Sequence, residues 1–210
     1  MKIESWDLPL RNYIFFSGWQ TYTLIIMHGL GDQMESYRDF PELIAIPNVN
    51  YILLNAPEPY VIGWKWYDLE GNQEIGLKNS QNLLEKTIEI LKTKLKIEKN
   101  KIILSGFSQG GVVSLFTGLR SREAYGGIIS LSGYFYGDYK ELSQESKQTP
   151  IFLAHGLYDP LIPFDWVKTQ AEQLNHLGYT ITWKEYPIEH TISYVEIQDL
   201  RDWLKTIMKF

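Results

Sequence analysis

The sequence predicts an α/β fold with a mostly parallel sheet, and two patterns support this prediction. Short runs of apolar and β-branched residues recur along the 210-residue chain, as expected for parallel strands that are buried on both faces. Longer segments between these runs place apolar residues three or four positions apart, which is the spacing of one helix face. Strands that alternate with helices in this way are typical of a sheet covered by helices.

The first two predicted strands lie close together along the chain. The short connection between them, Ser17-Gly18-Trp19-Gln20, therefore predicts that they pair as an antiparallel hairpin. The predicted strands are 12–16, 21–27, 51–54, 101–104, 127–131, 151–154 and 180–186.

Helical periodicity marks the segments between and after these strands. An apolar stripe along residues 84–95 predicts one helix, and similar stripes follow at 112–119 and 193–210. Pro163 suits the first turn of a further helix, and Gly178 suits its end.

Composition narrows the class of protein. The chain is 44% hydrophobic and 14% aromatic, which supplies material for a core and for an apolar site. It has no repeat, low-complexity tract or linker, so residues 1–210 are expected to form a single domain. The net charge of −5, from 25 acidic and 20 basic residues, argues against a nucleic-acid partner.

Several absences in the sequence exclude other classes. Without cysteine there is no disulfide, no thiolate metal site and no cysteine nucleophile. The N-terminal residues contain no apolar run of signal-peptide length, and no segment approaches the roughly 20 apolar residues of a membrane span. A cytoplasmic protein without stable membrane insertion is therefore expected.

A G-x-S-x-G motif, Gly106-Phe107-Ser108-Gln109-Gly110, lies between a predicted buried strand and a predicted helix. In this setting the serine stands on a sharp turn that exposes its hydroxyl above the sheet edge. The other interpretation is a glycine-rich strand–helix turn without chemistry. The position between strand and helix favours Ser108 as a nucleophile.

A serine nucleophile needs a base, and the base needs an acid that orients it. His190 follows the last predicted strand and precedes the last predicted helix, so it is the expected base. Asp159 follows a buried strand by a few residues and is the expected acid. Asp138 is the alternative acid, whereas Asp165 falls within a predicted helix.

A tetrahedral intermediate also needs two donors for its oxyanion. The backbone N–H of Gln109, directly after the nucleophile, is one candidate. The backbone N–H of Leu30, in a glycine-rich turn after an early strand, is the other. His28 and His155 precede glycines at strand ends, where they are expected to orient loops rather than transfer protons.

Several short motifs, spread from about residue 22 to the last residues of the chain, occur in the same order as in one known protein family. With these motifs the sequence resembles the phospholipase/carboxylesterase family of α/β-hydrolases, which includes acyl-protein thioesterases. The resemblance implies an α/β-hydrolase fold with about seven mostly parallel strands, helices on both faces and no separate lid domain. The motifs are His28-Gly29-Leu30-Gly31-Asp32, Asn55-Ala56-Pro57, Trp66-Tyr67-Asp68, Gly106 to Gly111, His155-Gly156 with Asp159, and His190 before the final helix.

The resemblance also implies a serine esterase that cleaves acyl esters or thioesters through an acyl-enzyme, without a metal or an organic cofactor. By motif position it assigns Ser108, Asp159 and His190 to the catalytic triad. It assigns Leu30 and Gln109 to the oxyanion hole. The expected partner is a small-molecule ester or an acylated substrate, and a homodimer stays open as the assembly.

Two features depart from the family pattern. The loop at 57–68 looks shorter than usual and lacks a Pro-Val-Thr run, so a preference for acyl-chain length does not carry over. Glu189 stands where relatives often have a small residue, and its carboxylate either influences the neighbouring histidine or faces solvent. Trp64, Trp66 and Tyr67 are candidate substrate-binding residues, with Trp64 closing the far end of a short acyl pocket. Packing of Trp66 and Tyr67 in the core stays open as the alternative.

Two further functions remain open at this point. A dienelactone-hydrolase-like or peptidase activity is compatible with the same scaffold, since fold does not determine substrate. A non-catalytic binding protein with the α/β-hydrolase fold is the alternative from a different class. The presence of a serine, an aspartate and a histidine at all three triad positions argues against the latter.

Overall fold

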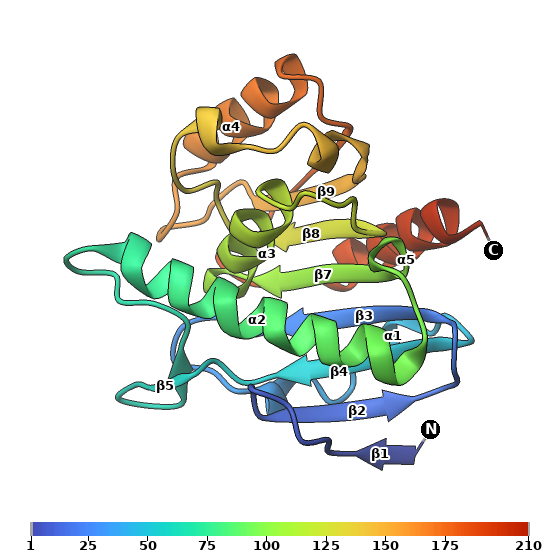
Figure 1. The fold of residues 1–210 in the computed structure, drawn as a ribbon. Helices are drawn as coiled ribbons and strands as arrows, with labels where there is room; N and C mark the ends of the chain where they lie inside the picture. Colours follow the sequence, from blue (N-terminus) through green and yellow to red (C-terminus); the bar gives the residue numbers. More distant parts are fainter. Residues whose placement is uncertain (1, 210) are drawn as a thin grey trace.

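The computed structural model describes residues 2–209, which are organised around an eight-stranded sheet (Figure 1). Its strand order is β1-β2-β4-β3-β7-β8-β9-β10. Strand β2 pairs antiparallel with β1 and β4, and the remaining pairs are parallel. The strands are β1 (Lys2–Glu4), β2 (Asn12–Phe16), β3 (Tyr22–Met27), β4 (Val49–Leu54), β7 (Ile102–Phe107), β8 (Gly127–Leu131), β9 (Ile151–Gly156) and β10 (Ile181–Tyr186), with a separate hairpin of β5 (Glu58–Pro59) and β6 (Trp64–Lys65).

Helices cover both faces of this sheet (Figure 1). The long helix α2 and helix α3 lie on one face, and α4 packs on the same side near the β9–β10 edge. Helices α1 and α5 lie on the opposite face. The helices are α1 (Phe40–Ile44), α2 (Gln73–Leu95), α3 (Gln109–Leu119), α4 (Phe164–His176) and α5 (Tyr194–Met208), with short 3-10 helices at Met34–Tyr37, Lys99–Lys101, Tyr139–Glu141 and Glu145–Gln148.

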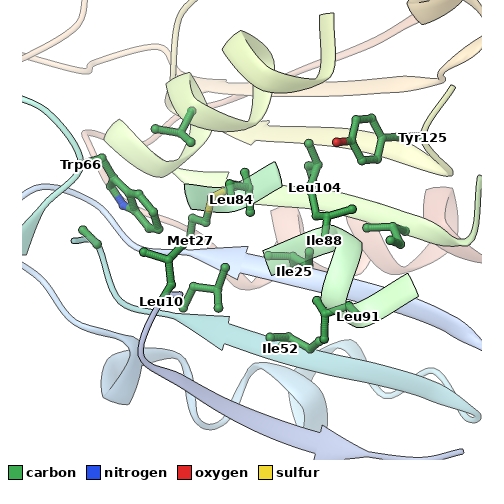
Figure 2. Packing of buried hydrophobic residues seen from close by; sticks show 14 of the residues in the cluster. Leu10, Ile25, Met27, Ile52, Trp66, Leu84, Ile88, Leu91, Leu104 and Tyr125 are labelled. Carbon is green, nitrogen blue, oxygen red and sulfur yellow. The ribbon is translucent and has the colours of Figure 1, made fainter. Parts of the chain in front are cut away.

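Alternation along the central strands divides the core into two layers. Odd and even positions of a strand point to opposite faces, so Ile25 packs toward α2 while its neighbour Ile26 packs toward α5. Figure 2 shows Leu84, Ile88 and Leu91 of α2 packed over the sheet. All three side chains are essentially inaccessible to solvent. Burial of one such side chain contributes about 1.5–3 kcal/mol, and the predicted apolar stripe of this helix is confirmed.

The predicted hairpin of the first two strands is wrong. Strand β4 lies between β2 and β3, so the two strands never pair. The side chain of Asn50 in β4 accepts the backbone N–H of Ser17 at 2.8 Å and donates to the carbonyl of Gly18 at 2.9 Å. The side chain of Asn50 thus satisfies backbone polar groups of the connecting segment. Strand β3 is a central strand, hydrogen-bonded to β4 on one side and to β7 on the other.

Smaller differences concern the ends of elements and the shortest strands. The strands β1, β5 and β6 have only two or three residues, too few for a periodic pattern, and were not predicted. Helix α4 begins at Phe164, so Pro163 is its N-cap rather than part of its first turn. The helix ends just before Gly178, as predicted.

Candidate active site

The turn that carries Ser108 joins β7 directly to α3. Ser108 has φ 51° and ψ −118°, a strained conformation for a residue with a side chain. Its backbone N–H donates to the carbonyl of Leu131 in the neighbouring strand at 2.9 Å. A Cβ on Gly106 would collide with the backbone of Gly110, and a Cβ on Gly110 would collide with the carbonyl of Met27. The two glycines are therefore required because three backbone segments approach closely.

Ser108, His190 and Asp159 form one hydrogen-bonded series. The loop after β9 supplies Asp159, and the loop between β10 and α5 supplies His190. Ser108 Oγ lies 2.9 Å from His190 Nε2, and His190 Nδ1 lies 2.6 Å from Asp159 Oδ2. The three side chains that the sequence predicted as a triad, separated by up to 82 positions, thus come together at the carboxyl ends of three parallel strands.

The environment of Asp159 determines the protonation of this series. Its side chain is fully buried, and its Oδ1 accepts the backbone N–H groups of Leu161 at 2.8 Å and Ile162 at 2.9 Å. Burial would raise the pKa of this carboxyl, but the hydrogen bonds from His190, Ile162 and Leu161 outweigh it, so the pKa is lowered. Because an ionised carboxylate only accepts, Nδ1 of His190 carries the proton and Nε2 accepts from Ser108.

The turn after β3, which contains Leu30, lies next to Ser108, since a Cβ on the neighbouring Gly29 would lie 3.3 Å from the Cβ of Ser108. Among residues 2–209 neither the backbone N–H of Leu30 nor that of Gln109 makes a hydrogen bond within the protein. His28 holds the turn, since its Nδ1–H donates to the carbonyl of Gly29 at 2.6 Å and its Nε2 accepts the N–H of Ala56 at 3.0 Å. Burial lowers the pKa of His28, which keeps it neutral in this bridging role.

The side chain of Gln109 performs a function that sequence analysis missed. Its amide oxygen accepts the N–H of Trp66 at 3.0 Å, and its amide nitrogen donates to the carbonyl of Tyr67 at 2.9 Å. The indole of Trp66 is fully buried and donates to the carbonyl of His28 at 2.9 Å. These bonds attach the loop after β6 to the turn that carries Ser108. The only signal for this role in the sequence was an amide side chain directly after the predicted nucleophile.

A cavity of about 900 Å³ opens beside Ser108 and His190. Its size is within the range of small-molecule sites. Besides these two residues, its lining comprises Gly29, Leu30, Asp32, Tyr67, Leu69, Gln73, Phe107, Gln109, Tyr134, Phe135, Tyr136, Gly137, Tyr139, Leu161, Ile162, Trp166 and Gln170.

Of the three predicted substrate-binding aromatics, only Tyr67 lines this cavity. Trp66 and Tyr67 both belong to the buried core, as the alternative interpretation allowed. The expectation that Trp64 closes the acyl pocket is corrected, because the β5–β6 hairpin directs its ring toward the core and the N-terminal segment. There the guanidinium of Arg11 lies 5.4 Å from the ring centroid of Trp64.

The wall of the cavity comes instead from residues that sequence analysis did not select. The largest group of them lies in the segment 133–139, Gly-Tyr-Phe-Tyr-Gly-Asp-Tyr, which follows β8. Its density of aromatic residues directly after a strand was a usable signal. Trp166, from the first turns of α4, completes the wall by packing on Tyr134.

Arg120 and Gln170 hold this aromatic segment from behind. Gln170 pairs with both backbone groups of Phe135, accepting its N–H and donating to its carbonyl, each at 2.9 Å. Arg120 donates to the carbonyl of Tyr136 at 3.1 Å and to the carboxylate of Glu141 at 2.7 Å. The cavity wall is therefore supported by buried or nearly buried polar groups rather than by packing alone.

Other residues weighed in the sequence lie outside the hydrogen-bonded series. Asp138 is exposed and accepts the N–H of Lys140 at 2.9 Å, and Asp165 is exposed at the start of α4. The side chain of Glu189 also faces solvent. His155 is buried and borders the series, because its Nε2 lies 2.9 Å from the carbonyl of Ile162 and 3.3 Å from Asp159 Oδ2; it orients the loop that carries Asp159.

The family model described as Phospholipase/Carboxylesterase matches residues 17–208. The chain belongs to the phospholipase/carboxylesterase family. This membership confirms the resemblance drawn from the motifs and the α/β-hydrolase fold that it implied. No separate lid domain occurs in the described part of the chain.

Individual relatives agree with this membership in the phospholipase/carboxylesterase family. Acyl-protein thioesterase 1 of Aspergillus fumigatus is 31% identical over 214 residues, which cover 90% of this chain and 88% of that protein. Acyl-protein thioesterase 1 of Yarrowia lipolytica is 32% identical over 211 residues, which cover 90% of this chain and 93% of that protein. The solved carboxylesterase of Bacillus cereus has a TM-score of 0.83 at 14% identity and 94% coverage of both chains, a likeness of fold alone.

As a member of this family, the protein is an enzyme that hydrolyses carboxylic esters or thioesters. The alternative of a non-catalytic binding protein is thereby set aside. None of the helices in residues 2–209 combines the length and the apolar character that crossing a bilayer requires.

Proposed function

We propose that the protein cleaves its ester or thioester through an acyl-enzyme on Ser108, with His190 as the base and Asp159 as the residue that orients it. The observation that supports this most directly is the unbroken series from Ser108 Oγ to His190 Nε2 and from His190 Nδ1 to Asp159. A neutral imidazole with its free lone pair toward the serine is the form that can accept the hydroxyl proton.

In the first half of the reaction, Ser108 Oγ attacks the carbonyl carbon while its proton passes to His190 Nε2. The negative charge that develops on the carbonyl oxygen is held by the backbone N–H groups of Leu30 and Gln109. The tetrahedral intermediate then breaks its C–O or C–S bond. His190 returns the proton to the leaving alcohol or thiol, and the acyl group remains on Ser108.

In the second half, a water molecule attacks the acyl-serine and gives its proton to His190. Collapse of the second intermediate releases the carboxylic acid and restores the Ser108 hydroxyl with the proton from His190. Asp159 stays ionised throughout and stabilises the imidazolium that forms twice in each cycle. The names of the relatives, acyl-protein thioesterases, favour acyl thioesters of proteins among the substrates to be compared.

A fluorophosphonate probe tests the nucleophile. Intact mass should increase by one adduct, and peptide mapping should locate that adduct on Ser108, with no labelling of Ser108→Ala. An adduct on the nearby Ser105, or none on folded protein, contradicts the assignment. Parallel assays with p-nitrophenyl esters, an acyl thioester and a matched amide identify the reaction. Comparable rates on the amide would favour a peptidase instead.

A further inference from the structure

One wall of the cavity beside Ser108 is built from flat aromatic surfaces. Aromatic side chains outnumber aliphatic ones among its lining residues. The rings of Tyr134 and Trp166 pack with their centroids 4.9 Å apart and their planes 37° from parallel, and Trp166 remains 46% exposed. Such a surface attracts a ring by stacking in addition to the burial that any apolar group gains.

Four tyrosines line the cavity, and the hydroxyl hydrogens of two of them, Tyr67 and Tyr134, are already used. Tyr134 Oη lies 3.4 Å from the amide oxygen of Gln73, which can only accept, so the Tyr134 hydroxyl donates there. Tyr67 Oη lies 3.2 Å from Tyr134 Oη and therefore donates to it. Burial raises the pKa of both tyrosines, which keeps them protonated. The hydroxyl hydrogens of Tyr67 and Tyr134 are thus both used, and toward a ligand these two oxygens can only accept.

We infer that the cavity binds a phenol group of the substrate, with its ring against Tyr134 and Trp166 and its hydroxyl donating to Tyr67 Oη. The inference rests on the proposed function and specifies its substrate class. An alkyl chain would cover the same wall without using these acceptors, whereas a phenol hydroxyl would gain a hydrogen bond there. A phenol supplies both the ring and the donor.

A hydroxyl on the substrate should strengthen binding if the inference is correct and weaken binding if the pocket is merely apolar. In a pocket without a partner, a hydroxyl on the substrate loses its water and weakens binding. Opposite an unused acceptor, the same hydroxyl strengthens binding, because the bond replaces the one made to water. The phenol can belong to the acyl part or to the alcohol part of the ester, so both must be varied.

The first experiment compares kcat/KM for matched esters of the wild-type enzyme. The acyl arm uses methyl 4-hydroxyphenylacetate, methyl phenylacetate and methyl octanoate. The alcohol arm uses 2-(4-hydroxyphenyl)ethyl acetate, 2-phenylethyl acetate and octyl acetate. In the arm that carries the phenol, the hydroxyl should raise kcat/KM by about three- to tenfold over the unsubstituted ring. In that arm, kcat/KM for the ester with the unsubstituted ring should also exceed kcat/KM for the alkyl ester.

Three variants then assign the effect to residues. The double variant Tyr67→Phe/Tyr134→Phe should abolish the advantage of the hydroxyl, since it removes the oxygen to which the phenol is proposed to donate. Trp166→Leu should reduce the ring-to-alkyl ratio by about fivefold through lost stacking. Tyr158→Phe is the matched control, because Tyr158 is 65% exposed and does not line the cavity, and both ratios should persist. Ratios within one variant cancel any loss of folded protein.

The outcomes that overturn the inference are distinct from those that overturn the proposed function. A hydroxyl that lowers kcat/KM in both arms, on an enzyme that still hydrolyses esters and labels at Ser108, overturns the inference alone. An undiminished hydroxyl effect in the double variant overturns the assignment to Tyr67. Absence of hydrolysis of every ester by folded enzyme overturns the proposed function and the inference together.

Discussion

Glu196 and Ser193 bond reciprocally at the start of α5, three residues after His190. The carboxylate of Glu196 accepts the N–H of Ser193 at 3.2 Å, and Ser193 Oγ accepts the N–H of Glu196 at 3.1 Å. Glu196 is 1% exposed, and its second oxygen has no hydrogen-bond partner among the described residues. This capping box ends the loop that carries the proposed base.

The buried carboxyl of Glu196 predicts a loss of stability as pH rises. Burial raises its pKa to about 7, against 4.5 for the free residue, although the bond from Ser193 opposes the shift. A raised pKa in the folded state means that the folded protein binds more protons than the unfolded chain between these values. The free energy of unfolding should therefore fall by about 3 kcal/mol from below pH 4.5 to above pH 7 through this group.

Glu196→Gln isolates that contribution. Glutamine keeps the acceptor for Ser193 but does not ionise, so the decline between about pH 4.5 and pH 7 should be reduced in urea unfolding curves. The pKa of Asp159 is lowered from 3.8, so the stability that its ionised carboxylate contributes is lost only as pH falls below 3.8. That loss lies outside the window in which Glu196 titrates. An identical pH profile for both proteins would mean that Glu196 ionises normally in the folded state.

Replacement of Asp159 by asparagine should nearly abolish turnover. The amide no longer holds the His190 tautomer that accepts from Ser108, and in a well-studied triad the same change costs about 10⁴ in kcat. Asp138→Asn is the control, since Asp138 is exposed and caps a short helix, and it should stay within a few-fold of wild type. Both are measured as kcat on p-nitrophenyl acetate with a melting curve. The reverse ranking in folded variants would make Asp138 the acid.

A methyl group at Gly110 should unfold the turn that carries Ser108. The added Cβ of Gly110→Ala would collide with backbone atoms of Met27 and His28, which cannot move without breaking β3 from its neighbours. A loss of about 3 kcal/mol or more in the free energy of unfolding is expected. Gly18→Ala is the control, because a Cβ there meets only a methyl of Thr21 at 3.5 Å. Equal stability of the two variants would contradict the close approach.

Arg120→Met should weaken substrate binding without contact between Arg120 and the substrate. Its side chain is 11% exposed and supports the aromatic wall through the carbonyl of Tyr136 and the carboxylate of Glu141. We expect kcat/KM to fall about tenfold, mostly through KM, because the wall binds ground state and transition state alike. The neighbouring exposed Arg122→Met should retain the wild-type KM. A fall in kcat alone would place the effect on the chemical step.

Much of the site could be predicted because the residues proposed to carry its chemistry lie in short, local sequence patterns. A serine between glycines at a strand–helix junction, an aspartate just after a buried strand and a histidine before the last helix each have a short-range signature. Parallel strands end at one edge of the sheet, so these residues meet once the strands are assembled. The structure brings Ser108, His190 and Asp159 within hydrogen-bonding distance in this way.

The wall of the cavity could not be predicted in the same way. Tyr134 and Trp166 are 32 positions apart, and only the packing of α4 beside the segment after β8 brings their rings together. Trp64 and Tyr67 lie three positions apart and both pack on the core, yet only Tyr67 also borders the cavity. No periodicity in an irregular loop indicates which side chain turns which way.

By itself, the sequence determined the alternation of strands and helices and the turn that carries Ser108, and it indicated the residues that are proposed to complete a triad with it. These features depend on the burial period of each element and on steric limits within a few residues. Only the tertiary structure decided that β4 separates β2 from β3, and that a wall of aromatic side chains borders the cavity. Burial patterns specify which face of an element is covered, whereas pairing order and loop direction depend on contacts between residues far apart in the chain.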